Sequence, residues 1–107
     1  EDMLWADGII FGPPENFGYM SGAMKDLFDR TFYPLEGQLE GMPIAIFISA
    51  GNDGTGALTS IRRIGNGYGF KEVQEPLIAV GELTDEMLDA CETLGMYLAA
   101  GLEGGIF

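Results

Sequence analysis

Histidine is absent from this 107-residue sequence, and cysteine occurs only once, as Cys91. Without imidazole groups, and with a single thiol, the chain offers no internal disulfide and no thiolate metal cluster. We find neither a nucleophile–base pair nor a metal site in it, so no catalytic side chain is assigned. Because no disulfide is required, a reducing compartment is permitted, and we expect a cytoplasmic protein.

Basic residues are also scarce. Five Lys and Arg residues stand against 17 Asp and Glu residues, which gives a net charge of −12. Such a field repels phosphate backbones, so we expect no nucleic-acid partner, and the acidity is explained most simply by a solvated surface. No apolar run approaches the roughly 20 residues that a membrane helix needs, so we expect no membrane partner either.

Apolar residues make up 47% of the chain, as in a globular protein, and the length predicts a single domain over residues 1–107. Short apolar runs predict strands at Gly8–Phe11, Met42–Ser49 and Pro76–Val80. These runs lack polar alternation, which is typical of parallel strands covered on both faces.

Helical segments are expected between and after the strands. Apolar spacing predicts helices over Ser21–Phe32 and Ala57–Ile64, ended by Pro34 and by the glycine-rich run 65–69. Thr84 is a good N-cap for a third helix, whose apolar stripe comprises Met87, Cys91, Leu94, Leu98 and Leu102. We expect Cys91 to be a small core residue, and Trp5 to pack beside the first strand. Strand–helix alternation predicts an α/β fold with a parallel sheet.

Two loops follow strands and precede helices, which is where open α/β sheets bind ligands. The first is "GPPENFGYMSG" (12–22), in which prolines stiffen the backbone while Phe17 and Tyr19 offer flat apolar faces and Asn16 can donate and accept. The second is "SAGNDGTGA" (49–57), whose backbone N–H groups from Gly51 to Gly56 are expected to be free. Together these loops suit a planar heteroaromatic ring with polar edges. The alternative interpretation is two ordinary glycine-rich turns.

Other candidate features have simpler explanations. Gly51-x-x-Gly54-x-Gly56 matches neither the dinucleotide nor the P-loop fingerprint. Arg62 and Arg63 carry the charge to meet a 2′-phosphate, but a solvated helix face is the preferred interpretation. The connections at 37–43 and 65–75 are expected to be ordinary turns.

The stretch "ADGIIFGPPENFGYMSGAMKDLFDRT" (6–31), with Ser21, Lys25, Asp29 and Arg30 in helical register, is followed later by "PIAIFISAGNDGTGA" (43–57). These stretches resemble the flavodoxin-like family, specifically its NAD(P)H-dependent FMN reductase and quinone reductase branch. The resemblance implies a three-layer parallel α/β sheet, FMN as cofactor and NAD(P)H as a further ligand. It also implies that Pro14–Gly18 border the isoalloxazine ring and that Ala50–Gly54 bond its pyrimidine edge. The cofactor-binding residues expected in all are Pro13, Pro14, Glu15, Asn16, Phe17, Gly18, Tyr19, Ala50, Gly51, Asn52, Asp53 and Gly54.

The likeness departs from the family pattern in two ways. Pro13, Glu15 and Asn16 replace the hydroxyl and larger residues common in the branch, and the likeness begins at the family's third strand. We therefore expect an incomplete, partial flavodoxin-like domain in which Gly8–Phe11 is an unpaired edge. A homo-oligomer, or a missing N-terminal segment, is expected to complete it.

Three functions stay open at this point. The first is an FMN-dependent NAD(P)H oxidoreductase, active when the protein is complete or oligomeric. The second is a non-catalytic flavin electron carrier, and the third is a cofactor-free fragment or interaction module.

Overall fold

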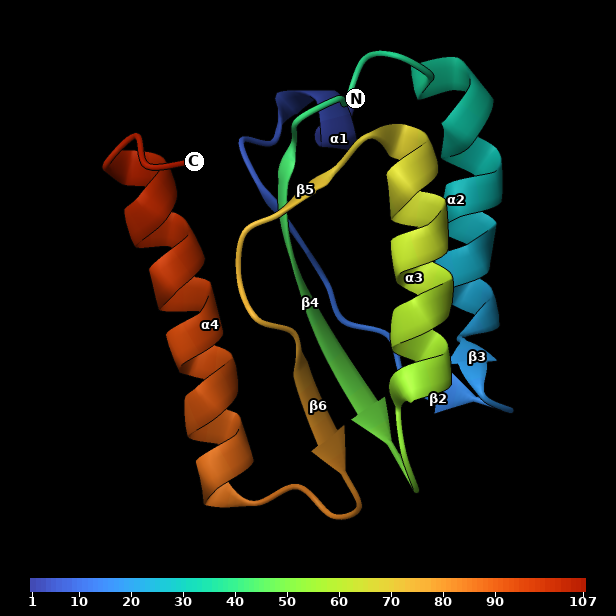
Figure 1. Cartoon of the computed structure of the whole chain (residues 1–107), viewed down its shortest axis with the longest axis vertical. Coiled ribbons are helices and arrows are strands. Elements are labelled where there is room, and N and C mark those ends of the chain that lie inside the picture. The colour runs from blue at the N-terminus through green and yellow to red at the C-terminus, as the bar shows by residue number, and fades with distance from the viewer.

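The computed structural model describes all of residues 1–107 and arranges them around one parallel sheet (Figure 1). The strands of this sheet are β1 (Ile9–Phe11), β4 (Pro43–Ala50), β5 (Lys71–Glu72) and β6 (Leu77–Val80). β4 is the central strand. β1 pairs with one side of it, and on the other side β5 pairs with its first residues and β6 with its last residues. Every pairing in this sheet is parallel, so the predicted α/β architecture is confirmed.

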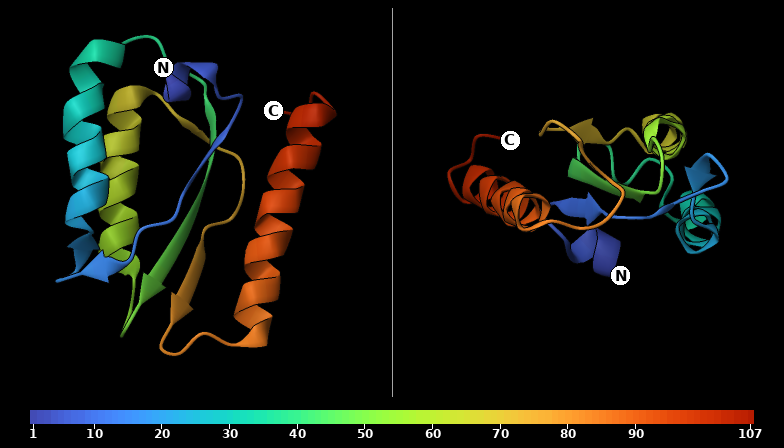
Figure 2. Two further views of the ribbon diagram at one scale, coloured as in Figure 1. Left: turned by 180° about the vertical axis from the view of Figure 1, so that it is seen from behind. Right: turned by 90° about the horizontal axis from the view of Figure 1, so that it is seen from below.

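The helices form two layers, one on each face of the sheet. α2 (Gly22–Leu35) and α3 (Thr55–Tyr68) lie side by side on one face, and α4 (Asp85–Glu103) covers the other (Figure 2). A short helix, α1 (Asp2–Trp5), precedes β1, and a small antiparallel hairpin of β2 (Glu15–Asn16) and β3 (Tyr19–Met20) lies between β1 and α2.

The two faces of β4 divide the core between the layers. Ile44, Ile46 and Ile48 are buried with residues of α2 and α3, whereas Ala45 is buried with Leu94 and Leu98 of α4. Alternate strand residues point to opposite faces, and both faces here are covered. This double covering explains why the sequence of β4 is almost continuously apolar.

The predicted strands are all present within one residue of their expected ends, but both middle helices are longer than expected. Pro34 does not end α2, because it lies in the last turn and removes only one intrahelical bond, while buried Leu35 extends the helix into the core. α3 runs through Gly65 to Tyr68, and Gly69, with φ of 80°, ends it. The segment after it is not an ordinary turn, because it contains β5.

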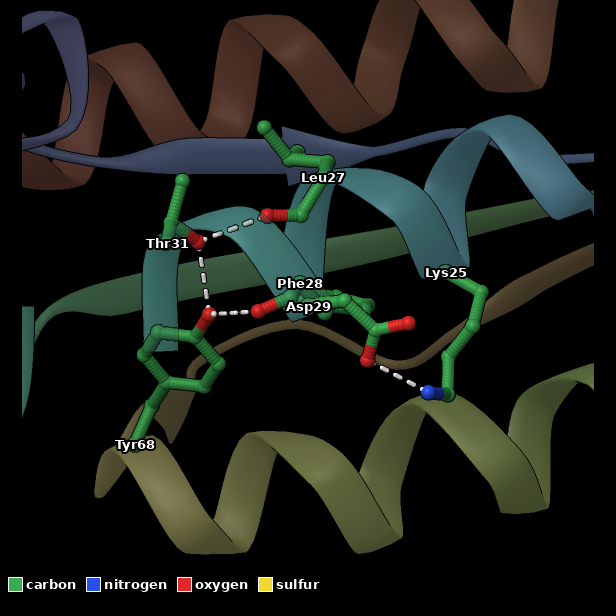
Figure 3. Close-up of polar contacts among 6 residues, drawn as sticks. All are labelled: Lys25, Leu27, Phe28, Asp29, Thr31 and Tyr68. Carbon is green, nitrogen blue, oxygen red and sulfur yellow. Dashed lines mark hydrogen bonds and ion pairs between the residues drawn. The ribbon is translucent and has the colours of Figure 1, made fainter. Parts of the chain in front are cut away.

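Tyr68 explains the extension of α3. Its ring is buried and stacks on Phe70 at a centroid distance of 4.8 Å. Its hydroxyl donates to the Phe28 carbonyl at 3.0 Å and shares a 2.6 Å hydrogen bond with the Thr31 hydroxyl, so it joins α3 to α2 (Figure 3). These contacts outweigh the poor helix propensity of the glycines at 65 and 67.

The remaining expectations concern α4 and the N-terminal region. Leu94 and Leu98 are buried and Cys91 is half-buried, so the predicted stripe faces the sheet. The prediction for Trp5 was wrong: its side chain is 85% exposed, because α1 leaves it pointing into solvent. β1 has β4 as its only strand partner, and Ile10 is 44% exposed, so the predicted unpaired edge is present. No helix of the structure has both the length and the apolar character to cross a membrane.

Candidate functional site

The two loops singled out in the sequence lie together at one rim of the sheet. β1 and β4 are parallel neighbours, so the loops that leave them start at the same edge. Pro14 forms a bridge with Ser49, and the Ser49 N–H donates to the Pro13 carbonyl at 3.3 Å. The first loop therefore follows the end of β4 rather than leaving the sheet directly.

Glu15 connects the first loop to the second. One oxygen of its carboxylate accepts from the Gly54 N–H at 3.0 Å, and the other accepts from the Ala57 N–H at 3.2 Å. The carboxylate thus satisfies backbone donors at the start of α3, where negative charge is favoured by the helix dipole. The N–H groups of this loop are consequently not all free, and the expectation that every donor from Gly51 to Gly56 was available was wrong for Gly54.

The first loop is not an irregular turn but the β2–β3 hairpin. Asn16 pairs with Tyr19, and the two residues between them, Phe17 and Gly18, have φ values of 52° and 71°. Positive φ at both central positions is the geometry of a tight two-residue hairpin turn. Phe17 is the only non-glycine residue with positive φ, and its ring is fully exposed, so the turn presents an aromatic face to solvent.

The hairpin is held against α3 by close backbone packing. A Cβ atom on Gly56 would overlap the carbonyl oxygen of Gly18, so only glycine fits at that position. The Met20 N–H donates to the buried Ser60 hydroxyl at 3.2 Å. Sequence reasoning did not identify Gly56 and Ser60 as positioning residues, because nothing in the pattern indicated that the hairpin would pack on α3.

The second loop leaves three consecutive donors available. Gly51, Asn52 and Asp53 are exposed, and their backbone N–H groups form no hydrogen bond with the rest of the chain. Gly54 is buried with φ of 88°, and a Cβ atom there would lie 2.5 Å from the Ile78 side chain. The glycine therefore permits the loop to turn tightly over β6 and to present its donors at the rim.

Besides Glu15 and Gly54, the other ten expected site residues fall into two groups by their environment. Pro13 and Ala50 are buried, and their carbonyl oxygens accept from Ser49 and from Gly81, so they fix the loops from below. The exposed residues of the expected set surround the rim: Pro14, Asn16, Phe17, Gly18, Tyr19, Gly51, Asn52 and Asp53. Asp53 is engaged locally, because its carboxylate accepts from the Thr55 hydroxyl.

Comparisons with solved structures show the same fold. The chain superimposes on a flavodoxin from the domain Archaea with a TM-score of 0.81 at 24% identity, covering 94% of this chain and 68% of that one. It also superimposes on a flavodoxin, WrbA-like protein, from Agrobacterium tumefaciens with a TM-score of 0.83 at 19% identity, covering 95% and 69%. The flavodoxin-like fold expected from the sequence is thereby confirmed.

Sequence comparisons extend this likeness. A flavodoxin of Aquifex aeolicus is 33% identical over 115 aligned positions, which cover 92% of this chain and 62% of that protein. A quinone oxidoreductase of Triphysaria versicolor is 42% identical over 69 positions, covering 60% of this chain and 34% of the relative. The chain thus spans less than two thirds of the length of these relatives. The profile of the NADPH-dependent FMN reductase family matches residues 1–85, and the chain belongs to this family, whose membership implies FMN as the cofactor.

Proposed function

We propose that the rim formed by the β2–β3 hairpin and loop 50–54 binds the ring system of FMN. The single observation that supports this most is the juxtaposition of two complementary features at one edge. The exposed aromatic ring of Phe17 lies on one loop, and the free N–H groups of Gly51, Asn52 and Asp53 lie on the other. This combination of groups suits a flat heteroaromatic ring with carbonyl oxygens on its edge.

Each expected residue has a part in this proposal that its environment permits. Phe17, Pro14 and Tyr19 provide apolar surface, and the Asn16 amide can donate to or accept from a polar ring edge. The free N–H groups of 51–53 donate to ring oxygens, and Gly18 allows the turn to approach closely. Pro13, Glu15, Ala50 and Gly54 hold the two loops in place through their hydrogen bonds and packing.

The proposed activity is NAD(P)H-dependent oxidoreduction. When bound, FMN supplies acceptance and donation of a hydride or of electrons, and the protein contributes orientation and electrostatics. This division agrees with the residues at the rim, which carry hydrogen-bond donors and an aromatic surface but no nucleophile–base pair. The match to the NADPH-dependent FMN reductase family and the quinone oxidoreductase relative support this activity. The cytoplasm stays the predicted location.

The direct test is a titration of FMN with the purified chain, in which flavin fluorescence is the measured signal. We expect the fluorescence to be quenched with a saturable profile, because the ring leaves water and contacts Phe17. Subsequent addition of NADPH or NADH should reduce the flavin and so bleach its absorbance. With a quinone present as electron acceptor, the nucleotide should then be oxidised continuously under steady-state conditions. If the fluorescence stays unchanged at high protein concentration, the chain does not bind FMN by itself.

A flavin electron carrier is the second candidate function. The flavodoxin of Aquifex aeolicus aligns with nearly the whole chain, and the net charge of −12 suits docking to a basic electron-transfer partner. The two candidates separate in one experiment. A carrier is reduced by dithionite but not by NADPH or NADH, whereas an NAD(P)H oxidoreductase is reduced by the nucleotide as well.

We also propose that the free edge of β1 is paired in the functional protein by another strand, from a second copy or from a further stretch of polypeptide. The edge is apolar and Ile10 is exposed there, which favours strand addition. Measurement of the mass in solution tests the first source. A dimer that becomes monomeric on Ile10→Lys substitution supports self-pairing, and a monomer of the unsubstituted chain at high concentration contradicts it.

A further inference from the structure

A hollow of about 340 Å³ lies beside the proposed flavin rim, on the outer side of α3. Gly18 and Tyr19 of the hairpin form one wall, and Thr55, Thr59 and Arg63 of α3 form the other. Gly18 and Tyr19 also belong to the proposed flavin rim, so the hollow adjoins that rim.

The α3 wall carries a polar ridge. Thr55, Thr59 and Arg63 are spaced four residues apart, so they lie above one another on a single face of the helix. The Thr55 hydroxyl donates to Asp53, whereas the Thr59 hydroxyl forms no hydrogen bond within the chain. Arg63 stands at the far end of the ridge, about 12 Å along the helix axis from Thr55 at a rise of roughly 1.5 Å per residue.

Arg63 is one of two basic residues of this acidic chain without a carboxylate partner, the other being Lys71 at the start of β5. Lys25 pairs with Asp29, Arg30 pairs with Asp26, and Arg62 forms two hydrogen bonds with Glu72. Arg63 has no carboxylate partner, and no acidic residue lines this first hollow. A chain with 17 acidic residues therefore leaves one guanidinium unneutralised beside its proposed cofactor site. Guanidinium groups bind phosphate by paired, charge-assisted hydrogen bonds.

A second hollow, of about 380 Å³, adjoins the first between α2 and α3 and shares Tyr19 and Arg63 with it. Its lining includes the half-buried Phe32 and the exposed Tyr33, whereas Phe28 is only 2% exposed and belongs to the core. The one carboxylate there, that of Asp29, is paired with Lys25 at 2.5 Å (Figure 3). An apolar, aromatic hollow next to an unpaired arginine suits a flat base that carries a phosphate on its sugar.

We propose that this composite groove binds the adenosine 2′-phosphate end of the hydride donor, with Arg63 on the phosphate. On this proposal, Arg63 makes the protein select NADPH over NADH. The inference rests on the proposed NAD(P)H-dependent function, since it concerns the nucleotide that meets the flavin. It also assigns different roles to the two neighbouring arginines, because Arg62 is occupied by Glu72 and only Arg63 is available.

The test uses adenosine 2′,5′-bisphosphate and adenosine 5′-monophosphate as probes, titrated calorimetrically into the full chain. We expect the bisphosphate to bind roughly tenfold more tightly, the ratio expected for one charge-assisted phosphate contact, and this preference to shrink with added salt. Arg63→Gln should abolish the preference. Lys71→Gln is the matched control, because Lys71 is also exposed and unpaired and its loss changes the net charge equally.

The kinetic counterpart is the ratio of KM for NADH to KM for NADPH, which should fall roughly tenfold in Arg63→Gln with kcat for NADPH little changed. Equal binding of the two probes, or a preference that survives Arg63→Gln, overturns the inference. If the probes discriminate but neither nucleotide reduces the flavin, the groove is supported while the proposed oxidoreductase function fails. If both nucleotides serve equally and the probes bind equally, the oxidoreductase function stands and the role of Arg63 is refuted.

Discussion

The carboxylate of Glu15 and the N–H of Gly54, 39 residues apart in sequence, form a 3.0 Å hydrogen bond that joins the two loops of the candidate site. The second carboxylate oxygen reaches Ala57 at the same helix end. This side chain therefore links the hairpin to the second loop, in addition to the contacts of the hairpin with Gly56 and Ser60. A ring bound between them would find its two walls already in position, so less ordering entropy would be lost on binding.

Replacement of Glu15 should separate the loops. Glu15→Ala removes both acceptors and leaves backbone donors at a partly buried helix end, so we expect the free energy of unfolding to fall by about 1–3 kcal/mol. FMN affinity should fall as well, because the loops lose their fixed spacing. Urea unfolding and FMN titration measure the two effects. Glu82→Ala is the control, because this substitution removes the same charge and the exposed Glu82 carboxylate has no hydrogen-bond partner. Identical unfolding curves for the two variants would show that Glu15 is not a structural link.

Replacement of Phe17 separates binding from stability. The ring is fully exposed in the free protein, and alanine keeps the Cβ that disfavours positive φ, so Phe17→Ala should leave the unfolding midpoint nearly unchanged. If Phe17 contacts the flavin ring, the Kd for FMN should rise roughly five- to tenfold, as expected for one aromatic contact. Tyr97→Ala, at an exposed position on α4, should leave the Kd unchanged. An unaltered Kd in Phe17→Ala would remove this residue from the proposed site.

The strands and the location of the rim were predictable from the sequence because they depend on local patterns. The apolar run of β4 indicates a strand buried on both faces, and parallel neighbours place their following loops at one edge. The hairpin was not predictable in this way. Phe17 adopts a positive φ that favours glycine, and the packing of Gly18 against Gly56 that accompanies it appears only in the folded chain.

Long-range contacts explain the other differences. The bonds from Glu15 to Gly54 and Ala57 link loops that are distant in sequence, so neither loop indicates the partner of the other. The extension of α3 depends on the buried ring of Tyr68, which overrides the helix-breaking tendency of the glycines before it. Similarly, only the structure reveals that Glu72 occupies Arg62 and leaves Arg63 free.

Gly56→Ala tests the contact between the hairpin and α3. Alanine has the higher helix propensity, which alone would stabilise α3 by roughly 1 kcal/mol. However, the added methyl group would overlap the Gly18 carbonyl, so we expect net destabilisation and displacement of the hairpin. Gly95→Ala in α4 is the matched control, because no neighbouring atom lies within 4 Å of its added Cβ. That control should gain stability in thermal or urea unfolding. A Gly56→Ala variant that gains as much as Gly95→Ala would show that the hairpin moves aside freely.

The Tyr68 hydroxyl provides a pH-dependent test of the α2–α3 contact. Burial raises the pKa of the Tyr68 phenol above its ordinary value of 10.0, although the hydrogen bond from Thr31 opposes the shift. The folded state therefore keeps the phenol proton at pH values where the unfolded chain releases it. The stability contributed by the neutral phenol is complete below pH 10.0 and is lost as the pH rises through the higher pKa of the folded state.

Tyr68→Phe should accordingly change both the size and the pH dependence of stability. At neutral pH the variant should lose about 1–2 kcal/mol, because the hydroxyl bonds to Phe28 and Thr31 disappear. Above pH 10 the difference between the two proteins should narrow, since the unsubstituted chain then loses the advantage of its protonated phenol. Tyr97→Phe, at an exposed hydroxyl without a partner, should follow the unsubstituted protein throughout. A difference between Tyr68→Phe and the unsubstituted chain that stayed constant from pH 7 to pH 11 would mean that Tyr68 has the same pKa folded and unfolded, and that its hydroxyl is open to water through the α2–α3 contact.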